Sequence, residues 1–136
     1  MTAREYLEKV RKTSKLILAT SEELAVIKAR KENLKSVEIS ERVKSSSEYK
    51  NFLDELIDEE QQIIAERRKI HSEWWHCREM IKQIDNSDYS DVLRYYYLLN
   101  YKRWDIVADK MHISERRIYT LHGYALEEFR KISGLS

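Results

Sequence analysis

A stripe of residues at alternating spacings of four and three runs along the chain from residue 49 to residue 84. We call this stripe the seam; its positions are Tyr49, Leu53, Leu56, Glu60, Ile63, Arg67, Ile70, Trp74, Cys77, Ile81 and Ile84. Heptad spacing keeps these side chains on one side of a helix, so it predicts a long helix that packs against another helix. Glu60 and Arg67 interrupt the apolar pattern, and we expect them to face each other or a partner and to fix the register.

A shorter stripe with the same alternation lies nearer the N-terminus, in a helix expected from about Thr2 to Leu34. Its members are Leu7, Val10, Ser14, Ile17, Ser21 and Leu24. The chain contains no proline and only two glycines, so little in it interrupts a helix. No alternating run of β-branched residues favours a strand. The sequence therefore predicts an all-α protein.

Residues 35–48 separate the two stripes, and their β-branched residues and serines predict a loop-like connector of about this extent. A connector of this length makes an antiparallel, coiled-coil-like hairpin over residues 1–84 the simplest arrangement. Residues 1–50 are net basic and residues 51–84 are net acidic, which suits packing of one helix on the other.

The seam does not account for all apolar residues of the second helix, since Ile57, Ile64 and Trp75 lie outside it. We expect a second subunit to cover part of this surface, so the hairpin predicts a homo-oligomer of two or more copies. The residues expected to hold the oligomer seam are Leu56, Ile63, Ile70, Trp74 and Ile81.

Short polar residues at positions 85–88 break the helical pattern and can cap the next helix, so we place a domain boundary there. Residues 85–136 are expected to form a second domain. Its first helix is predicted over residues 89–99, ending at Asn100 in the left-handed conformation. The side chains expected on its inner side are Val92, Leu93, Tyr96 and Leu99, and those expected to be exposed are Tyr95 and Tyr97.

The segment from Trp104 to Gly123 has the pattern of two short helices that meet at an apolar corner. The side chains expected in that corner are Val107, Ala108, Met111, Ile113, Ile118 and Leu121. Ser114 is suited to cap the second helix, with Glu115 near the positive end of its dipole. The pattern predicts a helix-turn-helix, which is the shape that fits a DNA major groove.

At about 100° per residue, the second helix turns Ile118, Leu121 and Ala125 inward, and a polar face lies opposite them. The residues expected to contact bases are Glu115, Arg116, Tyr119 and Thr120, with Gly123 on the same face. Arg116 can donate two hydrogen bonds to guanine, and Thr120 can contact a base edge or a thymine methyl. The residues expected to contact phosphates are Lys102, Arg103, Lys110 and Arg117.

Other classes of function find little support. The formal net charge of +1 argues against bulk polycation binding, so any DNA contact must come from a local patch. No nucleophile, base and orienting group occur together, so we expect no enzyme and no cofactor. His71, His76 and Cys77 lack the spacing of metal ligands on one helix face, and no metal is expected. The single cysteine and the absence of a leader or apolar span predict a cytoplasmic protein that does not enter a membrane.

Residues 91–131 resemble region 4 of bacterial sigma factors. The residues that carry this resemblance are Asp91 to Arg94, Val107 and Ala108, Ile113 and Ser114, and Ala125 and Leu126. An N-terminal helix with the sequence EYLEKVRK at residues 5–12 and a long second helix precede this region. In this arrangement the whole chain resembles small phage-encoded regulators related to RinA and ArpU. The resemblance implies a regulator of phage late genes in a bacterial host, with its DNA-reading positions at Glu115, Arg116, Tyr119 and Thr120. His112 replaces the usual turn glycine, and Tyr119 stands where a basic residue is common.

Taken together, the sequence predicts a sequence-specific regulator that oligomerises through its hairpin, binds double-stranded DNA at promoters and recruits host RNA polymerase. Two alternatives stay open. One is a DNA-packaging protein similar to a terminase small subunit, which also joins a helix-turn-helix to an oligomerising helical region. The other is a sigma-like module that binds RNA polymerase without contacting DNA. The operator sequence, the subunit number, and activation or repression are not set by the sequence.

Overall fold

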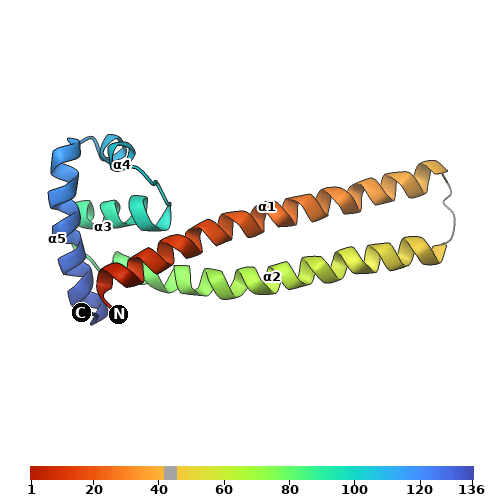
Figure 1. The fold of residues 1–136 in the computed structure, drawn as a ribbon, viewed down its shortest axis with the longest axis horizontal. Coiled ribbons are helices and arrows are strands. Elements are labelled where there is room, and N and C mark those ends of the chain that lie inside the picture. The colour runs from red at the N-terminus through yellow and green to blue at the C-terminus, as the bar shows by residue number, and fades with distance from the viewer. Residues whose placement is uncertain (42–45) are drawn as a thin grey trace. The chain divides into compact units, whose positions relative to one another are not determined.

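The computed structural model of the chain describes residues 1–41 and 46–136, and these residues form helices without any strand. The helices are α1 (Ala3–Glu41), α2 (Ser46–Lys82), α3 (Ser87–Leu93), the π-helical turn η1 (Arg94–Leu98), α4 (Trp104–Met111) and α5 (Glu115–Ser133) (Figure 1). The predicted all-α class and the long pair of N-terminal helices are therefore confirmed.

The connector predicted over residues 35–48 is too long. Helix α1 continues to Glu41 and α2 begins at Ser46, while residues 42–45 lie outside the described part of the chain. β-Branched residues and serines lower helix propensity by only a few tenths of a kcal/mol each, roughly, and no glycine or proline stops the helix here. Weak helix formers alone therefore do not make a loop at residues 35–41 and 46–48, which are helical.

The chain divides into two compact units whose boundaries cut through both long helices. The head unit consists of Met1–Leu16 and Ile70–Ser136, and the hairpin unit consists of Ile17–Lys69. This division differs from the boundary predicted between residues 84 and 85. The reason is that both ends of the N-terminal region, the start of α1 and the end of α2, contribute side chains to the core of the C-terminal helices.

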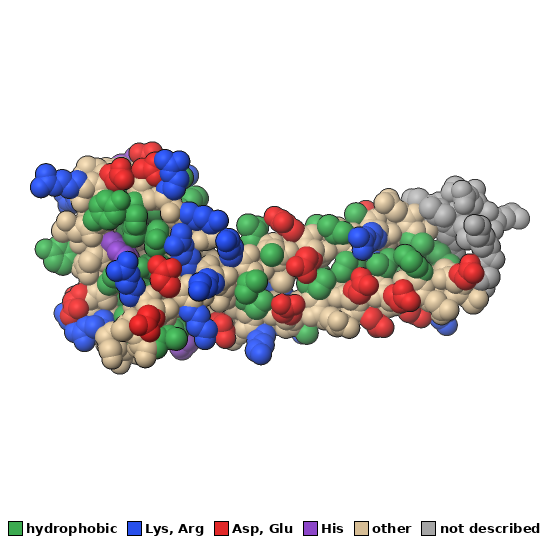
Figure 2. Space-filling view, viewed as in Figure 1, with side chains coloured by type: hydrophobic (Ala, Val, Ile, Leu, Met, Phe, Trp, Pro, Cys, Tyr) green, Lys and Arg blue, Asp and Glu red, His purple; other side chains and the backbone are tan. Residues whose placement is uncertain are grey.

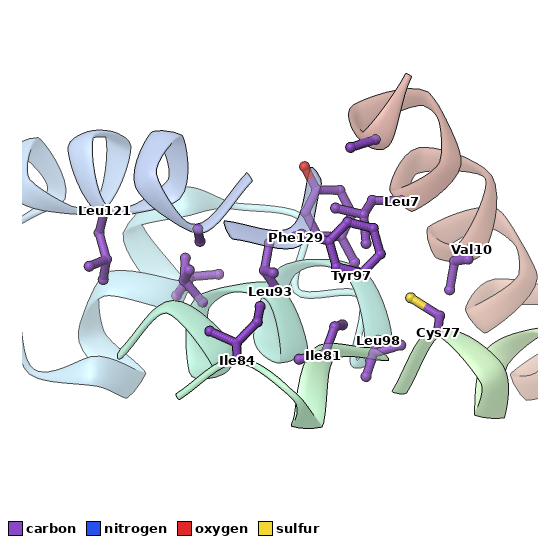
Figure 3. Close-up of a cluster of buried hydrophobic side chains, with 14 of the residues drawn as sticks. Leu7, Val10, Cys77, Ile81, Ile84, Leu93, Tyr97, Leu98, Leu121 and Phe129 are labelled. Carbon is purple, nitrogen blue, oxygen red and sulfur yellow. The ribbon is translucent and has the colours of Figure 1, made fainter. Parts of the chain in front are cut away.

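The core of the head unit is one cluster of buried side chains from every helix of that unit (Figure 3). Its members without measurable exposure include Leu7, Cys77, Ile81, Tyr97 and Phe129. The rings of Tyr6 and Phe129 stack with centroids 6.0 Å apart. Burial raises the pKa of the Cys77 thiol to about 12, so this cysteine is a protonated packing residue, as its place in the seam predicted.

The hairpin unit is formed by the later part of α1 and the first part of α2, which run antiparallel (Figure 1). Ile27 and Leu56 are its buried apolar side chains among those described. Lys31 Nζ lies 3.2 Å from Glu60 Oε1, so the acidic residue in the seam faces a cation on the neighbouring helix. Arg67, in contrast, is exposed, so within the chain Glu60 pairs with Lys31, and a contact of Arg67 with a partner stays a prediction.

The seam residues expected to hold an oligomer are distributed over both units. Leu56 and Ile63 lie in the hairpin unit, and Ile70, Trp74 and Ile81 lie in the head unit. Leu56 and Ile81 are 4% and 0% exposed within a single chain, so the chain's own helices already cover them. Trp74 Nε1 donates a hydrogen bond to the carbonyl of Leu98 at 3.2 Å, which fastens α2 to the end of η1.

The side chains that are buried after α3 differ from those that the sequence predicts. Between Arg94 and Leu98 the backbone forms a π-helical turn, and the N–H of Leu99 donates to the carbonyl of Arg94 at 2.9 Å. The wider turn moves the inward face on by one position, so the buried side chains are Val92, Leu93, Tyr97 and Leu98. The predicted exposure of Tyr97 is wrong, and Leu99, expected inside, is 55% exposed. Tyr95 and Tyr96 are partly buried.

Candidate nucleic-acid interface

A tight turn over residues 112–114 joins α4 to α5. His112 adopts the left-handed conformation with φ 58° and ψ 40°, and its N–H donates to carbonyls at the end of α4. The Ser114 hydroxyl accepts a hydrogen bond from the N–H of Arg117 at 3.2 Å, which confirms the predicted cap. Because both ends of the turn are hydrogen-bonded, the first residues of α5 are held in a defined orientation.

The inner side of this helix pair is packed as the sequence predicted. The fully or almost fully buried side chains are Val107, Ala108, Ile118, Leu121 and Ala125. Met111 and Ile113 are partly buried against the same cluster. Gly134 ends α5 in the left-handed conformation with φ 72°. The packed side leaves the opposite side of α5 open.

The four residues expected to contact bases all lie on that open side. Glu115, Arg116, Tyr119 and Thr120 are exposed at the start of α5. The ring of Tyr119 is 52% exposed, and its centroid lies 5.7 Å from that of Trp104, which limits its freedom without covering it. Gly123 continues this face, and a Cβ placed there would meet no atom within 4 Å. Contact with DNA at these positions stays a prediction.

A surface hollow of about 520 Å³ lies beside the start of α5. Its lining includes Asn86, Asp88, Tyr89, Arg116, Arg117 and Thr120. The structure thus brings Arg117 next to two expected base-contacting residues and adds the first turn of α3 to the site. The sequence predicts a cap within residues 85–88, and the structure assigns it to Asn86, whose Oδ1 accepts from the N–H of Asp88 at 2.9 Å. The sequence gives α3 no part in the site.

The other residues expected to contact phosphates lie at the two ends of α4. Lys102 and Arg103 precede it, Lys110 lies in its last turn, and all three are exposed. Arg103 forms two hydrogen bonds with Asp105, the shorter being 2.6 Å from Nη2 to Oδ2. An exposed pair of this kind contributes little to stability and is screened by salt, so the guanidinium can exchange this partner for a phosphate. Lys110 Nζ lies 5.7 Å from the Tyr101 ring centroid.

Behind the exposed face lies a buried polar contact that the sequence reading missed. Tyr97 Oη and His122 Nε2 are 2.7 Å apart, and His122 is 8% exposed. Burial, with a smaller effect from the Arg4 charge, lowers the pKa of His122 to about 4, so its ring is neutral at pH 7. The spacing from Ile118 to His122, Ala125 and Phe129 alternates four, three and four, which was the pattern that could have identified His122 as an inward residue.

His71 packs against two tryptophans of α2 in the head unit. The His71 ring stacks on those of Trp74 and Trp75, at 5.5 and 6.2 Å between centroids. Within residues 1–41 and 46–136, no three histidine, cysteine or acidic side chains are grouped as metal ligands. No helix in the same residues contains an apolar stretch long enough to span a lipid bilayer.

The fold and the candidate site define an all-helical protein with a capped helix pair presented at the surface of its head unit. A family model described as "Protein of unknown function (DUF1492)" matches residues 55–130, more than half of the chain, so the chain belongs to this family. The match covers most of α2 and continues through α3, α4 and most of α5. No curated protein and no solved structure matches the chain.

Proposed function

We propose that this protein is a sequence-specific DNA-binding transcriptional regulator that reads a major groove with the start of α5. The proposal rests on one observation: the exposed face of α5 is backed by side chains that are buried in the core. Arg116 and Thr120 are exposed, while Ile118 between them is fully buried. A helix held in this way can enter a groove without losing its own packing.

The hairpin unit supplies the second part of the proposal, which is assembly of two or more copies. Among the described residues of this unit, four large apolar side chains are exposed by more than a third, namely Leu18, Val26, Phe52 and Ile57. A helical pair that leaves so much apolar surface in water gains free energy when another copy covers it. Pairing would also raise the effective concentration of a second DNA reader, and so the affinity for repeated or palindromic half-sites.

The biological setting of the proposal rests on the resemblance to sigma region 4 and to phage regulators related to RinA and ArpU. By that resemblance, the protein acts at promoters of phage late genes in the cytoplasm of a bacterial host. Occupancy of the promoter would then recruit host RNA polymerase. No part of the proposed mechanism calls for catalysis or a cofactor.

The Arg116→Ala variant is expected to bind its selected duplex about 1–3 kcal/mol more weakly than the wild type and to discriminate less at one base position. The loss follows because a guanidinium can donate two hydrogen bonds to a guanine edge, whereas alanine donates none. The measurement is a mobility-shift titration on sequences that the wild type selects from random DNA.

The matched control for this variant is Arg130→Ala, which removes an exposed arginine further along the same helix. We expect its affinity and base preference to match the wild type. Equal behaviour of the two variants would show that the open face of α5 does not read bases. If the wild type binds RNA polymerase but causes no mobility shift of any duplex at any salt concentration, the alternative of a polymerase-binding module that does not contact DNA is favoured.

The native mass of the protein is expected to be that of a dimer or tetramer, because closed symmetry with few copies suits paired half-sites. Native mass spectrometry measures this directly. Replacing exposed Phe52 by aspartate should shift the population towards the monomer, since it places a charge on the apolar face of the hairpin unit. A ring of about eight or more subunits would instead favour a DNA-packaging protein.

A further inference from the structure

The start of α1 is fastened to the loop that precedes α4. Arg11 Nε donates to Asn100 Oδ1 and Arg11 Nη1 donates to Tyr96 Oη, both at 3.0 Å. Ser14 Oγ donates to the carbonyl of Tyr97, also at 3.0 Å. Asn100 holds the left-handed conformation, with φ 58°, so the loop leaves η1 in a fixed direction. These contacts all lie within the head unit.

This attachment brings two lysines together. Lys15 lies one turn after Arg11 on the same face of α1, and Lys102 lies shortly after Asn100 in the loop. The positive charge of Lys15 is the largest of the causes that lower the pKa of Lys102, and Arg11 adds to the effect. The hydrogen bonds of Arg11 and Ser14 to residues 96–100 therefore place Lys15 and Lys102 in one region of the head unit, where the charge of each acts on the other. Figure 2 shows lysine and arginine side chains gathered over the early turns of α1.

No carboxylate among the described residues forms an ion pair with either lysine. Two acidic side chains of the same elements have other partners, since Glu8 lies 3.7 Å from Arg11 and Asp105 pairs with Arg103. Like charges held side by side repel each other, and an anion bound between them relieves that repulsion. The arrangement therefore suits an oxyanion that accepts hydrogen bonds from both ammonium groups.

We propose that Lys15 and Lys102 together clamp one phosphate of the DNA backbone, so that α1 is part of the DNA interface. The clamp rests on the proposed function and extends it. Lys102 is followed directly by Arg103, which stands at the N-cap position of α4, so the clamp is continuous with the cations expected to contact phosphates. A phosphodiester is the anion that a DNA-reading helix pair would bring to this position.

The test uses the full-length protein and a random-sequence duplex, because a phosphate contact is independent of sequence. The Lys15→Gln/Lys102→Gln variant is expected to reduce the slope of log affinity against log salt concentration by about 1. At about 0.1 M salt, its affinity should fall about fivefold to tenfold on every duplex tested. Lys15→Arg/Lys102→Arg should keep most of the slope. Lys28→Gln removes an exposed lysine further along α1 and should change nothing.

The outcomes separate the clamp from the proposed function. A wild type that binds no duplex overturns both proposals. If the wild type binds DNA, and the Lys15→Gln/Lys102→Gln variant has the same affinity and salt slope as Lys28→Gln, the clamp alone is overturned. Melting curves with inorganic phosphate at constant ionic strength distinguish the source of the anion. Stabilisation of the wild type but not of the double variant, together with an unchanged DNA salt slope, would assign the site to free phosphate and overturn the DNA clamp.

Discussion

Leu7→Ala is expected to lower the free energy of unfolding of the head unit by about 2–5 kcal/mol. Leu7 is 0% exposed in the cluster that also contains Cys77, Ile81 and Phe129. Alanine would remove apolar atoms from that cluster and leave a cavity at the place where α1, α2 and α5 meet. Chemical denaturation followed by circular dichroism measures the change from the shift in the transition midpoint.

Leu16 offers a control of the same residue type on the same helix. It is 52% exposed, so Leu16→Ala should change the free energy of unfolding by no more than about 0.5 kcal/mol. A small effect of both substitutions would mean that the first turns of α1 do not belong to the head unit. The domain boundary predicted between residues 84 and 85 would then describe the protein better than the division at residues 16 and 70.

Features that depend on local periodicity were predictable from the sequence. The cap at Ser114, a cap within residues 85–88, the left-handed Asn100 and the buried corner around Ile118 follow from residue type and spacing. The π-helical turn was not predictable in this way, because one extra residue in a turn changes which side chains face inward. Burial of Tyr97 instead of Tyr96 is therefore decided by tertiary packing, since Tyr96 stacks on Trp104 at 3.9 Å between ring centroids.

The candidate site likewise has one part that could be predicted from the sequence and one part that could not. The exposed face of α5 could be predicted, because a single helix with a 100° repeat determines which residues lie opposite Ile118. The hollow beside Arg116 and the placement of Lys15 and Lys102 in one region could not be predicted, because each depends on residues far apart in the sequence. Nothing in the local pattern of α1 indicates that Arg11 will bind Asn100. Such pairings depend on how whole elements pack.

His122 connects this packing to pH, because it is buried in its neutral form beneath the exposed face of α5. Its ring lies 4.6 Å from that of Trp104, between centroids, and its Nε2 lies 2.7 Å from Tyr97 Oη. A charged imidazolium in this aromatic surrounding would lose its hydration without gaining a counter-ion. Burial, with a smaller effect from Arg4, therefore lowers the pKa of His122 from an ordinary value of 6.5 to about 4.

Between these two pKa values the unfolded chain binds more protons than the folded chain, so stability rises with pH in this window. The contribution of His122 is fully present above about pH 6.5 and is lost as pH falls towards about 4. The loss should reach about 2 kcal/mol by about pH 5 and about 3 kcal/mol at the lower end. Urea titrations at a series of pH values measure it.

Two variants isolate this effect from the titration of carboxylates in the same range. His122→Gln keeps an amide that can bond to Tyr97 but does not titrate, so its stability should depend less on pH between about 6.5 and 4. His76→Gln removes an exposed histidine of the same unit and should retain the wild-type dependence. Parallel curves for the wild type and His122→Gln would show that His122 is not held neutral. Protonation of His122 would then not affect the packing beneath Arg116 and Thr120. A steeper pH dependence for the wild type than for His122→Gln would show that this packing depends on a neutral His122.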